Sequence, residues 1–441
     1  MTLKNMLRGI GKFLKWSFIS IAAFICLLLL INAIDESPSK AAEALKAIPQ
    51  IKEVSNNGFL ALIGVSQAPP NEEFYNYGLQ WVNAYNSAAS EDDIAKANIR
   101  FKGKSLNFVG DKDKLCKPTK ARCLPLAKER AKLWRKYYAD NKLLVDRQRL
   151  LTNYSYFEDT YFPPAVSSPV LAYGQQFREL ILSLIALDAA EGRLESALST
   201  LESVIAFDRR ALLGSRSLIL SMMMRHRLLQ DYALLAEIVS TRTSLVMAQK
   251  ERLIRMTEPM EIDQVRYVAS RMFEGESRMF YRALPAVFKE SNAWRDNMMR
   301  PFFKQQATLN LLARDNGAFQ SRLQKFSHAE YDTWLTKDQQ ALETEDANDI
   351  YSLGVLYNIS GKLIVSSGRG DINDYLIRLA DLTGITRLAR LQVEVVTSRS
   401  SDSDKISIIT SNKSLFDPYT NQPMSLDSSK RKLYFDLKGN V

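Results

Sequence analysis

Residues 176–207 have the sequence QFRELILSLIALDAAEGRLESALSTLESVIAF, which carries the clearest structural pattern in the chain. The apolar spacing predicts one helix over residues 176–190, a tight break at residues 191–193 and a second helix over residues 194–207. Two antiparallel helices joined by a turn that contains Gly192 form an αα-hairpin. The side chains expected to face inward from the second helix are Leu198, Leu201 and Ile205.

This hairpin resembles a tetratricopeptide-type unit, because Ala189, Gly192, Ala197 and Leu201 stand where such a unit places small residues, its turn glycine and a continuing leucine. Residues 210–239 are expected to form a second pair of helices with a break near residue 230, but they lack the same signature. A regular array of three or more units is therefore not supported. The sequence predicts an irregular helical-hairpin body.

The remaining chain extends this mainly α prediction. Residues 71–89 and 371–398 have helical periodicity, and the first of these stretches has an aromatic stripe at spacings of three and four. We expect that stripe to be core, although stacking on carbohydrate is the alternative. Near the C-terminus, residues 415–424 are rich in turn residues and residues 432–437 alternate like a short strand, so a small β element is expected there. The members of the stripe are Phe74, Tyr77, Trp81 and Tyr85.

The N-terminus has the pattern of a single membrane span. An uncharged apolar run over residues 16–34 follows a basic segment and precedes Asp35 and Glu36, and it is long enough to cross a bilayer. Charge bias predicts a cytoplasmic N-terminus and a periplasmic body, with the span in the inner (plasma) membrane. A cleavable signal peptide ending at Ile31-Asn32-Ala33 is the main alternative. The basic residues are Lys4, Arg8, Lys12 and Lys15.

These features divide the chain into consecutive parts. Only 18 Gly and 14 Pro occur in 441 residues and 46% of the residues are apolar, so the part beyond the span is expected to be folded. The expected parts are a cytoplasmic segment (1–15), a transmembrane helix (16–34), a linker (35–55), a helical periplasmic domain (56–330) and a C-terminal helical region with the short β element (331–441).

Cysteine usage agrees with an oxidising compartment. Cys116 and Cys123 are the only cysteines outside the span, and their separation suits a small disulfide loop. Free thiols are the alternative. A zinc site would need more ligands, and the two histidines of the chain have no ligand-like spacing, so no metal or other cofactor is expected.

The disulfide loop lies within a basic segment, and this segment is the candidate site. Lysine and arginine far outnumber acids between residues 101 and 136, which accounts for much of the net charge of +10. An anionic lipid or glycolipid headgroup or an acidic protein face would be a suitable partner; an ordinary solvated surface is the alternative. The residues expected to contact an anionic partner are Lys114, Lys117, Lys120, Arg122, Lys128 and Arg130.

No catalytic motif emerges from the sequence. The segment Gly103-Lys104-Ser105 lacks the preceding glycine of a phosphate loop, and Glu290-Ser291 lacks the companion stretch of lytic transglycosylases. Neither a nucleophile elbow nor a metalloprotease helix occurs. No catalytic residue is therefore assigned, and an enzyme is not the favoured class.

Several of these features together resemble a family of uncharacterised bacterial single-pass envelope proteins. The resemblance rests on Asn-Gly-Phe-x-Ala-Leu-x-Gly at residues 57–64, the Cys-x6-Cys pair and Asp-Pro-Tyr-Thr-x-Gln-Pro at residues 417–423. It implies no activity. In the last motif Asn421 replaces the usual Gly, and Asn also tolerates a positive φ.

Two functional hypotheses follow from these expectations. The first is a non-catalytic, membrane-anchored binding or scaffolding protein whose partners are other envelope proteins. The second is an enzyme that acts on a glycan strand or a lipid-linked substrate through carboxylates that no motif reveals. Nucleic acid is not an expected partner of either, because the body is predicted to lie outside the cytoplasm.

Overall fold

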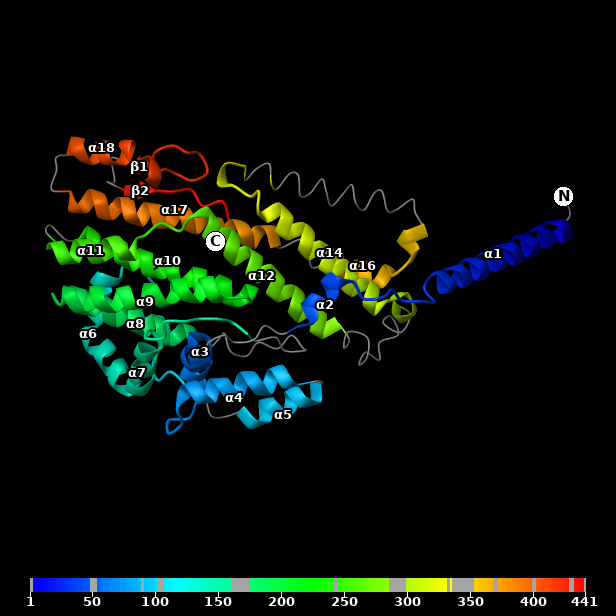
Figure 1. Ribbon diagram of the computed structural model, residues 1–441, viewed down its shortest axis with the longest axis horizontal. Helices are drawn as coiled ribbons and strands as arrows, with labels where there is room; N and C mark the ends of the chain where they lie inside the picture. The colour runs from blue at the N-terminus through cyan, green and yellow to red at the C-terminus, as the bar shows by residue number, and fades with distance from the viewer. Residues whose placement is uncertain are drawn as a thin grey trace.

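A computed structural model of the protein describes residues 3–47, 54–88, 91–101, 106–160, 174–241, 245–284, 299–330, 334, 353–367, 372–398, 402–427 and 432–439. Over these residues the protein is mainly α-helical, as predicted. Figure 1 shows an elongated helical body with one helix, α1, extending from its end and a two-stranded sheet formed near the C-terminus.

The α-helices are α1 (Leu3–Ile31), α2 (Lys40–Lys46), α3 (Gly58–Gln67), α4 (Phe74–Ser87), α5 (Glu91–Phe101), α6 (Cys123–Asp140), α7 (Lys142–Leu151), α8 (Gly174–Ala190), α9 (Leu194–Gly214), α10 (Leu218–Ser240), α11 (Met247–Met256), α12 (Ile262–Ala283), α14 (Gln305–Leu323), α16 (Ile359–Ser367), α17 (Ile372–Thr397) and α18 (Asp402–Ser411). Short 3₁₀ helices are η1 (Val54–Asn56), η2 (Lys112–Lys114), η4 (Arg300–Phe302), η5 (His328–Glu330), η6 (Leu353–Leu356) and η7 (Lys413–Leu415). The strands β1 (Ser425–Asp427) and β2 (Lys432–Tyr434) pair antiparallel.

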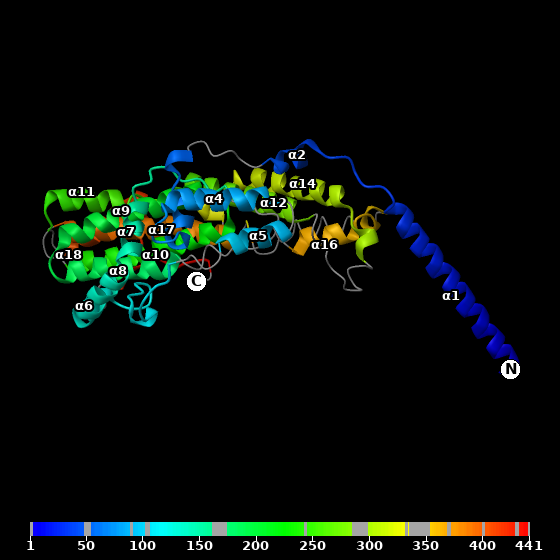
Figure 2. The ribbon, with the colours of Figure 1, turned by 90° about the horizontal axis from the view of Figure 1, so that it is seen from below.

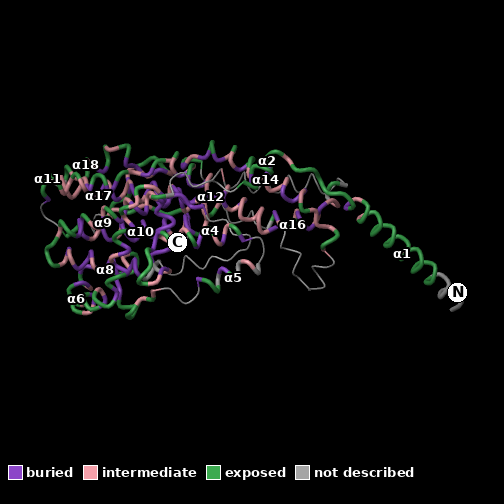
Figure 3. Tube along the Cα trace, turned by 60° about the horizontal axis from the view of Figure 1, so that its bottom comes forward, coloured by how far each residue is buried: buried purple, intermediate pink, exposed green. Residues whose placement is uncertain are grey.

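Helix α1 contains most of the span predicted over residues 16–34, but the helix ends at Ile31 and residues 32–34 lie beyond it. Within it, Ile10–Ile31 has a mean hydropathy of 2.3, and none of this stretch is buried against the body. By length and composition the helix can cross a membrane. It projects from one end of the body (Figure 2), and Figure 3 shows most of its coloured length as exposed.

The predicted αα-hairpin is formed by α8 and α9. Gly192 in the turn has φ = 85°, a conformation that glycine adopts without steric cost. The expected break near residue 230 is wrong, because α10 is one continuous helix from Leu218 to Ser240. It packs against both α9 and α17, and side chains on several of its faces are buried.

Four charged side chains join the helices of this hairpin to α10. Arg178 on α8 contacts Asp208 on α9 at 2.9 Å and also pairs with Asp231 on α10. Arg227 on α10 contacts Asp208 at 3.0 Å. All four side chains are at most 2% exposed, and their charges balance. Because a buried charge is costly without its partner, this cluster favours one register of the three helices.

Helices α3 and α4 pack unusually closely. A Cβ atom added at Gly78 would lie 1.9 Å from the carbonyl oxygen of Leu60, so only glycine allows this approach of the two backbones. The predicted aromatic stripe lies on α4 and is buried, which confirms that it belongs to the core. Tyr77 stacks edge-on against Phe101 of α5, with ring centroids 5.3 Å apart.

The C-terminal segment is fixed to α17 by a buried aspartate. The carboxylate of Asp381 accepts hydrogen bonds from the Tyr419 hydroxyl at 2.9 Å and from the backbone N–H groups of Lys438 and Gly439. Asn421 has φ = 51°, so it adopts the positive φ expected of it. The small β element is therefore attached to the helical body by polar contacts.

Candidate functional site

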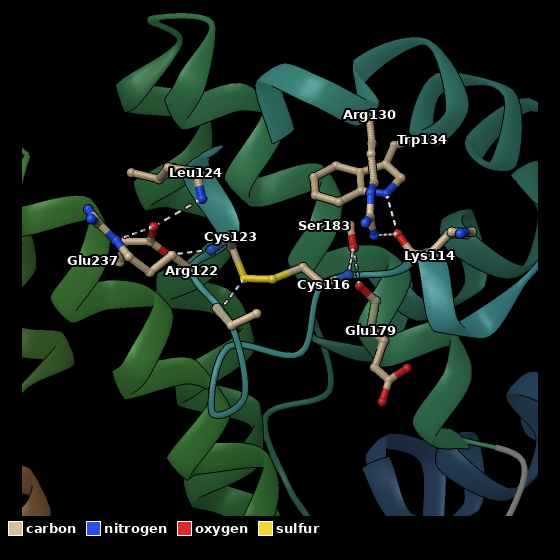
Figure 4. Close-up of a disulfide and its surroundings, with 11 residues drawn as sticks. Lys114, Cys116, Arg122, Cys123, Leu124, Arg130, Trp134, Glu179, Ser183 and Glu237 are labelled. Carbon is tan, nitrogen blue, oxygen red and sulfur yellow. Dashed lines mark hydrogen bonds and ion pairs between the residues drawn. A yellow bond between two sulfur atoms is a disulfide. The ribbon is translucent and has the colours of Figure 1, made fainter. Parts of the chain in front are cut away.

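The disulfide Cys116–Cys123 lies at the N-terminus of α6. The two Cα atoms are 5.6 Å apart, and neither cysteine is exposed. Figure 4 shows the disulfide between helices of the body, with Ser183 near one cysteine and Glu237 near the other. We call residues 116–123 the disulfide loop.

Glu237, on α10, holds the end of the loop that begins α6. Its carboxylate accepts hydrogen bonds from the backbone N–H of Cys123 at 2.6 Å and of Leu124 at 3.1 Å. The Arg122 guanidinium lies 3.5 Å from the same carboxylate. Because the first N–H groups of a helix have no intrahelical partner, an acidic side chain there both satisfies them and interacts favourably with the helix dipole.

The other end of the loop is held from α6 and α8. The Cys116 N–H donates to the Ser183 hydroxyl at 2.8 Å. The carbonyl oxygen of Lys114 accepts hydrogen bonds from the Trp134 indole at 3.0 Å and from the Arg130 guanidinium at 3.2 Å. The loop is therefore fixed to the body at both of its ends.

The structure divides the six predicted contact residues into two groups. Lys117, Arg122 and Arg130 are engaged within the protein: Lys117 forms a 3.0 Å ion pair with Asp113, which raises the pKa of Lys117. Their charges are consequently less available to a partner. The residues that are exposed and form no ion pair with any described residue are Lys114, Lys120 and Lys128.

The exposed lysines continue along α6. Lys128, Lys132 and Lys136 recur every four residues, which places them on one face of the helix. Across residues 106–140 there are ten Lys or Arg residues and four Asp or Glu residues. We call the exposed lysines of this region the basic surface. Its members are Lys112, Lys114, Lys120, Lys128, Lys132 and Lys136.

The basic surface is far from the apolar helix α1. Figures 1 and 2 both place α6 at the end of the body opposite α1. The charge is therefore presented away from the bilayer that α1 would cross. Position along the chain could not reveal this, and no sequence signal could have found Glu237, which lies more than 100 residues after the loop.

Two carboxylates meet at another helix terminus. Asp159 accepts the Ser217 N–H at 3.1 Å, and Glu276 accepts the Leu218 N–H at 2.7 Å, at the start of α10. Burial, with a smaller contribution from the nearby Asp159, raises the pKa of Glu276 to about 6. Both groups serve as helix caps, and neither lines the hollows described below.

The described surface has a hollow of about 460 Å³ between α11, α17 and η7. Three of its four charged side chains are paired within the protein: Arg390 contacts Glu394 at 2.8 Å, and Arg255 contacts Glu202 at 3.0 Å. A second, more open hollow of about 660 Å³ lies between α4 and α5 and is lined mainly by polar side chains. Among the residues that the structure describes, no group of three or more His, Cys, Asp or Glu side chains could hold a metal ion.

The chain matches no protein family, no curated protein and no solved structure. Its function is therefore inferred from its own geometry and charge.

Proposed function

We propose that this protein is a membrane-anchored binding or scaffolding protein of the bacterial envelope. In this proposal α1 spans the inner membrane with its basic N-terminus in the cytoplasm, and the body is periplasmic. The basic surface binds an acidic face of another envelope protein. The resemblance to single-pass envelope proteins agrees with this assignment. Two residues of the motifs that carry the resemblance have structural roles, because Asn57 caps α3 and Asn421 forms a turn.

One observation carries the proposal: a rigid, basic surface lies at the end of the body opposite the membrane helix. The disulfide and the contacts of Glu237 and Ser183 order the loop before any partner arrives. Binding therefore costs less conformational entropy than ordering a free loop would. Because the surface faces away from the anchoring bilayer, an acidic protein suits it better than the lipids of that bilayer.

Photo-crosslinking of the full chain in its native membranes tests the proposal. A photoreactive residue in place of Lys120 should give a specific adduct, and Gln at Lys114, Lys128 and Lys132 should greatly reduce its yield. The matched control removes the same amount of charge from exposed lysines elsewhere, by Gln at Lys325, Lys413 and Lys432; it should leave the yield unchanged. Equal loss in both variants, or no adduct together with hydrolysis of an envelope polymer, would contradict the proposal.

The orientation has a separate test. A reporter that is active only in the periplasm, fused after Val441, should be active, and one that is active only in the cytoplasm should be inactive. The opposite result would place the basic surface and the disulfide on the cytoplasmic side, and the proposal would fail.

A further inference from the structure

The end of α1 is joined to the body by a buried asparagine. Asn32 is 3% exposed and directly follows the last residue of α1. Its side-chain amide donates to the carbonyl oxygen of Leu356 at 2.8 Å, and its side-chain oxygen accepts the Asn358 N–H at 2.8 Å. Buried polar groups are costly without partners, so these contacts hold α1 against η6 and the start of α16.

A second set of contacts joins the next residues to α14. The Asp35 carboxylate accepts the backbone N–H groups of Gln306 and Ala307, both at 2.9 Å, in the first turn of that helix. The Asn310 side chain then accepts the Ser39 N–H at 2.9 Å and donates to the carbonyl oxygen of Ser37 at 2.9 Å. Residues 35–47, expected to be part of a linker, are thus attached to the body, and α2 packs on α12 and α14.

These contacts between the end of α1 and the body fix the distance of the body from any bilayer that α1 crosses. The apolar stretch of α1 ends at Ile31, one residue before the asparagine that binds Leu356. Any membrane that α1 crosses must therefore end close to η4, η6 and α16. Figures 1 and 2 show α16 beside the body end of α1, and η4 also contacts α1.

The surface at this level has the composition of a membrane interface. Leu363 on α16 is 56% exposed and Ile34 is 80% exposed, so both aliphatic side chains are open to the medium at this level. Arg300, on the η4 helix that contacts α1, is also exposed and forms no ion pair with any described residue. Aliphatic side chains and basic groups together favour the interface between acyl chains and anionic headgroups.

We infer that Ile34, η4 and α16 form a membrane-contact surface that rests on the headgroup layer of the bilayer crossed by α1. The inference rests on the proposed membrane anchoring and deepens it, because it makes the body a rigid extension of the helix. It also requires that α1 is retained: cleavage after Ala33 would remove Asn32 and leave the polar groups of Leu356 and Asn358 without their partner.

The cysteines of the chain allow a direct test by spin labelling. Cys26 is the only free cysteine outside the disulfide and is exposed in mid-span. A nitroxide on Cys26 of the full chain, reconstituted in nanodiscs of phosphatidylethanolamine and phosphatidylglycerol, reports insertion of α1. In a Cys26→Ser background, Leu363→Cys reports the contact surface. The matched control is Ile406→Cys on α18, which is 51% exposed and lies at the far end of the body.

Collision with oxygen and with a water-soluble nickel chelate measures the depth of each label. We expect the Cys26 label to be accessible to oxygen and protected from nickel, and the Leu363 label to be severalfold less accessible to nickel than the Ile406 label. A deep Cys26 label with equal nickel access at 363 and 406 would overturn the contact surface alone. An aqueous Cys26 label, or a purified chain that begins after Ala33, would overturn the membrane anchoring as well.

Discussion

Replacing Glu237 by Ala should release the disulfide loop from α10. The change removes a carboxylate, only 9% exposed, that accepts two backbone N–H groups of α6 and pairs with Arg122. Loss of a helix-capping side chain costs about 0.5–2 kcal/mol, and leaving a buried N–H without a partner costs about 1–3 kcal/mol. These two costs overlap. We therefore expect the free energy of unfolding to fall by about 1–2 kcal/mol, the range that the two estimates share.

Two companion variants make this prediction specific. Glu237→Gln keeps one of the two acceptor oxygens and loses the charge that favours a helix N-terminus, so it should cost less than Glu237→Ala, about 1 kcal/mol. Glu129→Ala removes an acid of α6 that is 68% exposed and whose ion-pair partner among the described residues is Arg130, so its effect should stay within about 0.5 kcal/mol.

Urea unfolding of the full chain in detergent micelles measures these differences, and hydrogen exchange locates them. The amides of Cys123 and Leu124 should lose protection in Glu237→Ala, whereas amides in the middle of α9 should keep theirs. If Glu237→Ala is no less stable than Glu129→Ala and both amides stay protected, the disulfide alone positions the loop and the role assigned to Glu237 is wrong.

Three further predictions concern the core and its titratable groups. Cys123→Ser should lower the free energy of unfolding by roughly 3–4 kcal/mol: about 2–3 kcal/mol from the lost loop closure and about 1 kcal/mol from burying a hydroxyl group. A reductant should destabilise the wild type but not the variant. Equal sensitivity of both proteins to the reductant would count against the disulfide. Gly78→Ala should lower the free energy of unfolding by about 3 kcal/mol or more, because the added Cβ would meet the Leu60 carbonyl. Gly317→Ala in α14, where an added Cβ has no atom within 4 Å, should instead stabilise the protein by up to about 1 kcal/mol. Thermal unfolding compares the two variants, and similar effects would refute the close packing of α3 and α4. Burial raises the pKa of Glu276 to about 6 from an ordinary value near 4.5, so the folded state binds more protons than the unfolded state between these pH values, and its stability falls as the pH rises. Urea unfolding should show that the wild type loses roughly 2 kcal/mol relative to Glu276→Gln between pH 4 and pH 7. A difference between the two proteins that does not depend on pH would disprove the pKa shift.

The candidate site was only partly accessible to sequence reasoning. The cysteine spacing predicted the disulfide, because two thiols seven residues apart can meet without help from the rest of the fold. Counting charges identified the basic region but overestimated the free charge, because Arg122 and Arg130 bind Glu237 and the Lys114 carbonyl instead. Those contacts depend on how α6 lies against α10 and on how the loop folds back along α6.

Local sequence patterns were enough to predict the apolar span, the α8–α9 hairpin, the buried stripe of α4 and the small C-terminal β element. Each of these depends on periodicity, composition or turn residues within a short window, where local chain geometry dominates. Three features became visible only in the tertiary packing: α10 runs unbroken, four buried charges link three helices, and Asn32 and Asp35 hold α1 against segments about 270 to 330 residues away. Such contacts form between groups brought together by packing, and the free energy of burying a polar group depends on partners that sequence distance does not reveal.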